Sequence, residues 1–181
     1  MNKDPYEKVL SKKEVFHGVL ISVEHWEAEI HGEKRALREI VRHTGAAAVV
    51  PIDEQGAVTL VEQYRIATGR TMLELPAGKK NSAEEDSLLC AKRELREETG
   101  LTARDWRLLS TIETSPGFTT ERIALYMATG LSQGEACPDE GEYVHSVIIP
   151  MREAIARVAR GDITDAKTVS GLMLSWYSIN G

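Results

Sequence analysis

Three glutamates near the middle of this sequence have the residue type and spacing best suited to chemistry. Glu94, Glu97 and Glu98 are spaced i, i+3 and i+4, so on a helix they lie on one face. Like charges at these spacings cost about 0.2–0.5 kcal/mol per pair on an isolated helix. A divalent cation removes this conflict, and Mg²⁺ accepts carboxylates, waters and substrate phosphates together. The spacing therefore indicates a metal site, with a solvated acidic helix face as the alternative.

The helix that carries these glutamates is predicted over about residues 84–99 and must hold its opposite face against a core. Its buried stripe is expected to be formed by apolar residues spaced i, i+3 and i+7, namely Leu88, Ala91 and Leu95. Ser82 or Asn81 is expected to cap its N-terminus, and Gly100 supplies the left-handed residue that ends a helix. A short strand at 71–75 precedes it, so its acidic face is expected beside turned backbone.

The elements around this helix predict a layered α/β domain. Residues 46–51 and 57–65 are rich in Val and Ala and are separated by a turn, which predicts a buried hairpin. Residues 14–41 alternate and predict two or three antiparallel strands after a frayed segment 1–13. The remaining expected elements are strands at about 105–113, 122–129 and 143–149, a helix at 151–160, and a last helix from Asp165 or Thr168 to about 178.

Charge and composition exclude several classes of protein. The 181 residues carry 22 basic and 28 acidic side chains, a net charge of -6, so a nucleic-acid partner is not expected. Cys90 and Cys137 are the only cysteines, too few for a disulfide framework, and Cys90 is expected to be a small buried apolar residue. No apolar stretch reaches the roughly 18–20 residues that cross a bilayer. We expect a cytoplasmic protein without a signal peptide or a membrane partner.

The acidic segment also resembles a known signature. Gly78, Glu85 and residues 93–101 resemble the signature of the Nudix hydrolases: glycine, five residues, glutamate, seven residues, then Arg-Glu-apolar-x-Glu-Glu-x-Gly-apolar. Glu85 stands the required seven residues before Arg93, but the loop after Gly78 then has one extra residue. Taking Glu84 instead restores the first spacing and breaks the second. The resemblance implies an α+β fold, an α/β/α sandwich with a central mixed β-sheet flanked by helices.

Further segments are similar to the ADP-ribose pyrophosphatase branch of that family, and the similarity spans about residues 14–178. These segments are residues 38–43, 61–65, 73–78 and 114–118, with Pro116 lying 15 residues past Leu101 as that branch's usual marker. The resemblance implies metal-dependent hydrolysis of ADP-ribose to AMP and ribose 5-phosphate. Two alternatives stay open: a pyrophosphatase for another nucleoside-diphosphate sugar such as GDP-mannose, and a Nudix-like nucleotide sensor without catalysis.

The resemblance also implies roles for single residues. The metal would be Mg²⁺, with Mn²⁺ as a substitute, and its ligands would be Glu94, Glu98, the carbonyl of Ala77, and Glu97 as a shared ligand. The proton acceptor would come from the acidic loop before the last strand, with Glu142 first and Glu140 second. Glu97 is kept among the catalytic candidates.

Substrate contacts are expected from several separate segments of the chain. Arg65 would reach a phosphate, as its planar fork suits, with Ala77 nearby. Arg38 and Glu39 resemble residues that touch the adenine side from a partner subunit, and Phe118 is a candidate aromatic for the base. The chain is therefore divided into an N-terminal antiparallel sheet at 1–43, for dimerisation and as a substrate lid, and a Nudix hydrolase domain at 44–181. The resemblance implies a homodimer, because a small sheet cannot bury both of its faces alone and in the resembling enzymes it packs across a twofold interface.

Overall fold

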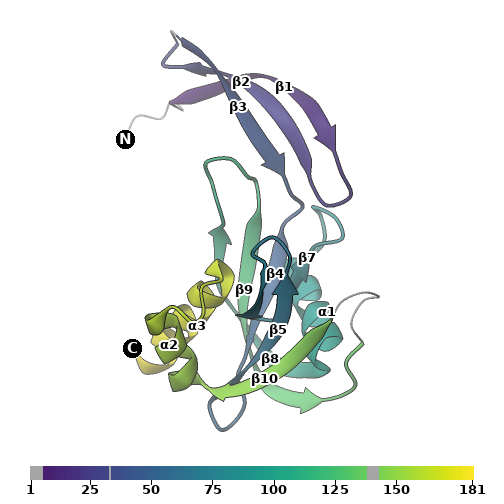
Figure 1. The fold of residues 1–181 in the computed structure, drawn as a ribbon, viewed down its shortest axis with the longest axis vertical. Helices are drawn as coiled ribbons and strands as arrows, with labels where there is room; N and C mark the ends of the chain where they lie inside the picture. Colours follow the sequence, from purple (N-terminus) through teal and green to yellow (C-terminus); the bar gives the residue numbers. More distant parts are fainter. Residues whose placement is uncertain (1–5, 33, 138–142) are drawn as a thin grey trace. The chain divides into compact units, whose positions relative to one another are not determined.

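The computed structural model describes residues 6–32, 34–137 and 143–181. It divides into two compact units, Met1–Thr44 with Glu113–Glu121, and Gly45–Ile112 with Arg122–Gly181. Figure 1 shows the strands and helices that make up each unit. Among the described residues, no helix has both the length and the apolar character needed to cross a membrane.

The first unit is built on an antiparallel sheet of three strands in the order β1-β2-β3 (Figure 1). These are β1 (Glu7–His17), β2 (Ser22–Ile30) and β3 (Lys34–Arg42). The expectation that residues 1–13 are frayed is wrong from Glu7 onward, because Glu7 pairs with Ile30 and Lys13 pairs with His25. Most side chains of β1 are exposed, so the strand lacks the alternation of apolar and polar residues that would have predicted it.

The described residues of the second unit form two sheets and three helices. A mixed sheet has the order β7-β4-β9-β8, in which β4 runs parallel to β9 and antiparallel to β7. A second, antiparallel sheet has the order β10-β5-β6. The strands are β4 (Ala46–Pro51), β5 (Ala57–Arg65), β6 (Arg70–Glu74), β7 (Ala77–Lys79), β8 (Leu101–Glu113), β9 (Arg122–Gln133) and β10 (Val144–Pro150). The helices are α1 (Ser87–Thr99), α2 (Met151–Arg160) and α3 (Ala166–Asn180).

The predicted hairpin of β4 and β5 is wrong. The turn between them is tight, since the Asp53 N–H donates to the Ala57 carbonyl at 3.0 Å, and Ile52 and Val58 form an isolated bridge. Beyond this bridge the two strands separate into different sheets. Both strands are largely buried, and consecutive apolar residues let each strand be covered on both faces by different layers.

The alternation of side chains along β4 determines which helix covers which face of the mixed sheet. Ala48 and Val50 belong to a core cluster that contains Leu172 of α3. The intervening residues Ala47 and Val49 belong to a second cluster with α1. Helices α1 and α3 therefore cover opposite faces of this sheet (Figure 1), which confirms the predicted α+β sandwich.

Helix α1 begins later than predicted and ends where predicted. Its N-cap is Asp86, whose carboxylate accepts hydrogen bonds from the N–H groups of Leu88 and Leu89 at 2.9 and 3.0 Å; the prediction of Ser82 or Asn81 is wrong. The cap Gly100 has φ 73°. A side chain there would also lie 2.6 Å from the Gly134 carbonyl oxygen, so this position requires glycine.

Candidate functional site

Glu94 lies against the backbone of the strand that precedes α1. A Cβ atom at Gly78 of β7 would be 2.1 Å from both the carboxylate carbon and Oε1 of Glu94. No side chain fits between them at that distance. Glycine at position 78 therefore allows the carboxylate to rest directly on strand β7.

Glu98 is held by the same strand, one residue earlier. Its Oε2 accepts a hydrogen bond from the Ala77 N–H at 3.0 Å, and the residue is buried. Ala77 itself pairs with Ala48 in the mixed sheet. The structure therefore brings together two of the predicted metal-binding positions, Ala77 and Glu98, through a contact between one backbone group and one carboxylate.

Arg93 connects the remaining carboxylates of the site. Its Nη1 donates to Glu94 Oε1 at 2.5 Å and to Glu97 Oε2 at 3.1 Å, and its Nη2 donates to the Lys79 carbonyl at 3.1 Å. Burial of the guanidinium acts to lower its pKa, but Glu94 and the other hydrogen-bonded groups outweigh this and raise it. The same guanidinium nitrogen therefore serves two carboxylates of the site, Glu94 and Glu97.

The loop before α1 brings in Glu85 rather than Glu84. Glu85 Oε2 accepts a hydrogen bond from the Asn81 N–H at 2.5 Å, and its Oε1 lies 3.8 Å from Arg93 Nε. Glu84 is exposed, and its N–H bonds to the Ser82 hydroxyl. The geometry therefore favours the register in which the extra residue lies between Gly78 and Glu85.

The donor set around Arg93 suits a hard divalent cation. Carboxylate and carbonyl oxygens are the ligands that Mg²⁺ and Mn²⁺ prefer, and the space above Gly78 is kept open to a carboxylate by the absence of a side chain. Within the described part of the chain, no three His, Cys, Asp or Glu side chains are already arranged as a metal cluster. In this arrangement Arg93 gathers the glutamates, so an ion that bound Glu94 would have to compete with the guanidinium.

Arg65, the predicted phosphate ligand, is held by a residue that sequence reasoning did not single out. Its Nε and Nη2 donate to the two carboxylate oxygens of Glu74 at 2.8 and 2.9 Å, and Lys167 of α3 contacts the same carboxylate. Burial alone would raise the pKa of Glu74, but the hydrogen bond from Arg65 and the charge of Lys167 lower it to about 2. The sequence feature that could have singled out Glu74 is its position between two leucines, Leu73 and Leu75, at the end of a predicted strand.

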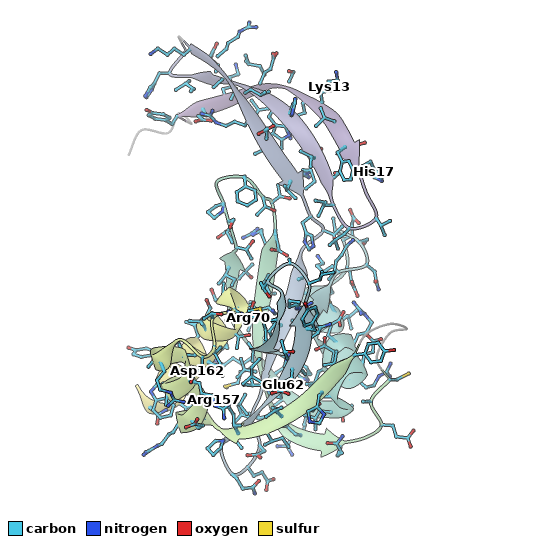
Figure 2. All side chains as sticks on the ribbon, in the orientation of Figure 1. Lys13, His17, Glu62, Arg70, Arg157 and Asp162 are labelled. Carbon is cyan, nitrogen blue, oxygen red and sulfur yellow. The ribbon has the colours of Figure 1, made fainter. Side chains whose placement is uncertain are left out.

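The start of α3 supports this ion-pair network. Asp165 caps the helix by accepting from the Thr168 N–H at 3.0 Å and also pairs with Lys167 at 3.0 Å, which confirms the predicted start of the last helix. Arg70, labelled in Figure 2, donates through Nη2 to the Thr164 hydroxyl at 2.8 Å. Strand β6 and the beginning of α3 are thus joined by polar contacts on the same side of the unit.

The predicted substrate residues outside this unit have contacts of their own. Arg38 donates through Nε and Nη2 to the Glu7 carboxylate at 3.1 and 2.7 Å, and Glu39 lies 3.7 Å from His25. Phe118 is 54% exposed, and its carbonyl accepts from the Val41 N–H at 2.7 Å.

The predicted proton acceptors Glu142 and Glu140 lie outside the described residues. The described segment before them ends beside α1, since the Cys137 N–H donates to the Glu97 carbonyl at 3.0 Å. Cys90 is fully buried, as expected, and burial raises the pKa of its thiol to about 11. This excludes Cys90 as a thiolate nucleophile near neutral pH.

The NUDIX domain model matches residues 42–171, more than half of the chain. The ADP-ribose pyrophosphatase of Mycobacterium tuberculosis is 36% identical over 169 residues, covering 92% of this chain and 81% of the relative. The methanol dehydrogenase activator of Bacillus methanolicus is 38% identical, covering 90% and 89%.

Two further similarities concern substrate and fold. The GDP-mannose pyrophosphatase of Cronobacter sakazakii is 29% identical, covering 97% of this chain and 94% of the relative. A crystal structure of an ADP compounds hydrolase matches with a TM-score of 0.84 and 24% identity, covering 100% and 99% of the two chains. At this identity the structural match establishes the shared fold.

Proposed function

Because this chain belongs to the NUDIX domain family, we propose that it hydrolyses the diphosphate of ADP-ribose to AMP and ribose 5-phosphate. The observation that carries the proposal is the Glu94 carboxylate resting on Gly78 beside Glu98 and Arg93. The similarity to an ADP-ribose pyrophosphatase over most of both chains supports this substrate. A sugar diphosphate also fits the net charge of -6 better than a polyanionic nucleic acid does.

Nudix hydrolases generally use a divalent metal ion, and we infer Mg²⁺, with Mn²⁺ as a substitute. Glu94, Glu97, Glu98 and the Ala77 carbonyl would hold it. The ion would offset the charge that develops on the diphosphate oxygens and lower the pKa of a bound water. In this scheme Gly78 keeps Glu94 beside the ligand set, and the Ala77 N–H orients Glu98.

Proton transfer and substrate positioning are assigned to other residues. Glu142 remains the first candidate for the proton acceptor and Glu140 the second, with Glu97 as a third carboxylate in the site. Arg65 would bind a phosphate as a planar fork, while Glu74 fixes the orientation of its guanidinium. Single Glu142→Gln and Glu140→Gln variants decide between the first two, since only the acceptor should change the pH dependence of kcat.

The N-terminal sheet would serve dimerisation and cover the substrate, in a protein of the cytoplasm. Large apolar side chains on this sheet are exposed, including Val9, Val15 and Phe16, whose exposed fractions are 42%, 44% and 53%. A partner subunit that packed on the sheet would cover them. Arg38, Glu39 and Phe118 would then contact the adenosine part of the substrate. Light scattering of the protein should give twice the chain mass of 20.1 kDa. The mass of a single chain would contradict the dimer.

A substrate panel tests the reaction itself. Purified protein with Mg²⁺ should release AMP from ADP-ribose with a higher kcat/KM than it shows for ADP-glucose, NADH or diadenosine polyphosphates. GDP-mannose is the specific competitor, because a GDP-mannose pyrophosphatase is also similar over most of the chain. Preferential release of GMP would establish that alternative, and release from no substrate would leave a nucleotide sensor.

Glu98→Gln tests the ligand assignment within the same assay. Glutamine can still accept the hydrogen bond from Ala77 but is a much weaker metal ligand, so the fold should persist while kcat/KM falls by about 100-fold or more. Glu62→Gln, on β5 and labelled in Figure 2, is the matched control because its side chain is exposed. Equal activity of Glu98→Gln and the parent protein would show that Glu98 is not a ligand.

A further inference from the structure

Helix α1 borders a cleft that shares Arg93 with the glutamate site but is otherwise lined by residues without a role in the proposed reaction. The cleft has a volume of about 430 Å³ and is lined by Lys92, Arg93, Arg96, Thr102, Ala103 and Trp106. We propose that it is a second ligand site, for a small phosphorylated molecule with a flat aromatic ring, of the nucleoside monophosphate class. This binding does not depend on the reaction proposed above.

The positive charge of the cleft comes mainly from Lys92 and Arg96. They are spaced i, i+4 on α1, so they lie on one face and repel each other, and both are exposed. Within residues 6–32, 34–137 and 143–181, neither forms an ion pair with a carboxylate. The guanidinium of Arg93, by contrast, is already hydrogen-bonded to Glu94. An anion between Lys92 and Arg96 would relieve their repulsion.

The helix dipole explains only part of this arrangement. Arg96 lies in the last turn of α1, where a cation is favoured by the partial negative charge of the helix end. Lys92 lies one turn earlier and gains little from that effect, which falls off within the last turn. Its position beside the cleft is better explained by the aromatic wall it faces.

That wall is the indole of Trp106, and its orientation is fixed. Its Nε1–H donates to the Ala103 carbonyl at 3.0 Å, and its ring meets Tyr126 edge-on at 6.4 Å between centroids. The Lys92 ammonium lies 5.8 Å from the ring centroid, within cation–π range. A base stacked on Trp106 would take the place of the Lys92 ammonium over the indole, and an attached phosphate would then pair with that ammonium.

The size of the cleft favours a nucleotide over a bare anion. Small-molecule sites usually have volumes of about 300–1,000 Å³, apolar walls and a few polar groups. Inorganic phosphate would leave most of the 430 Å³ unfilled and would not contact Trp106. Base–aromatic stacking adds about 1–3 kcal/mol by alanine substitution in single-stranded nucleic-acid sites, so AMP should bind more tightly than phosphate.

Fluorescence of Trp106 tests the proposal directly. Trp26→Phe combined with Trp176→Phe leaves Trp106 as the last of the three tryptophans, and EDTA removes metal from the glutamate site. AMP should change the emission of Trp106 saturably and with higher affinity than inorganic phosphate. Calorimetry on protein with all three tryptophans repeats the measurement if the double variant folds poorly.

Charge variants identify the site of binding. Lys92→Gln combined with Arg96→Gln should weaken AMP binding by about 10-fold or more and leave the kcat/KM for ADP-ribose unchanged. Arg104→Gln combined with Arg107→Gln is the matched control, because it removes the same charge from β8 outside the lining. The proposal is overturned by no saturable change up to about 10 mM AMP, by equal affinities for AMP and phosphate, or by equal effects of the two double variants.

Discussion

Gly78→Ala is the sharpest perturbation that the structure offers. The new methyl group would lie 2.1 Å from the carboxylate carbon of Glu94, whereas ordinary contacts begin near 3.4 Å. The carboxylate must therefore move by about 1.3 Å or more. A displacement of about 1 Å in a catalytic site can cost about 100-fold in rate, so we expect kcat/KM for ADP-ribose to fall by about two orders of magnitude.

The same substitution should leave the fold intact. The colliding atoms are the far end of a flexible side chain, and Gly78 lies in strand β7 without a positive φ, so alanine can adopt its backbone. Replacing glycine at a compatible position stabilises by about 0.4–1 kcal/mol through the unfolded chain. This gain should offset part of the cost of moving Glu94, leaving the unfolding free energy within about 1 kcal/mol of the parent protein.

The assay combines turnover with thermal unfolding in Gly78→Ala, Glu94→Gln and the double variant. Since both changes act on one carboxylate, the double variant should be no slower than Glu94→Gln alone. Gly117→Ala adds the same methyl group where no atom lies within 4 Å, and it controls for the stability measurement. Parent-like turnover in Gly78→Ala would refute the placement of Glu94 on β7, and additive losses in the double variant would refute the shared mechanism.

Two further predictions concern stability and reactivity. The pKa of Glu74 is about 2 in the folded protein, below its ordinary value of 4.5, so its stabilising contribution is complete above about pH 4.5 and is lost as the pH falls toward 2. This difference in pKa corresponds to about 3 kcal/mol, and solvent around Arg65, which is 40% exposed, reduces it to about 2 kcal/mol. In urea titrations at decreasing pH, the free energy of unfolding should fall more steeply for the parent protein than for Glu74→Gln. Parallel pH dependences of the two proteins would contradict this. The exposed Cys137 should react with iodoacetamide at pH 8, while the buried Cys90 should react only after unfolding. Mass spectrometry counts the alkylated cysteines, and alkylation of both in the folded protein would contradict this prediction.

The acidic face of α1 could be predicted from the sequence because helical spacing and the residue that ends the helix determine it locally. Helical spacing places three glutamates together, and the αL position after Thr99 requires Gly100. The capping residue was missed because Asn81, Ser82 and Asp86 are all acceptable caps. The choice among them depends on how the loop closes, and in the structure Glu85 bonds back to Asn81.

The strand pairing could not be predicted from the same rules. Strands β4 and β5 are both buried and apolar, and a pattern without alternation does not say which neighbour each will pair with. The contact of Glu74 with Arg65 joins residues 9 apart, but that of Glu74 with Lys167 joins residues 93 apart. The sequence does not show that the start of α3 lies beside β6, and only this placement brings Lys167 to the carboxylate of Glu74 that Arg65 also binds.

The apolar face of helix α1 packs into the core, and this packing stabilises the helix independently of a metal ion. Cys90, Ala91 and Leu95 are fully buried on one face, and burying a leucine side chain contributes about 1.5–3 kcal/mol. Arg93 offsets the repulsion between Glu94 and Glu97 by donating to both carboxylates, and the Ala77 N–H satisfies one oxygen of the buried Glu98. Core packing thus positions the carboxylates before any ligand binds. The binding of a metal and a diphosphate therefore does not have to supply the free energy that orders this helix.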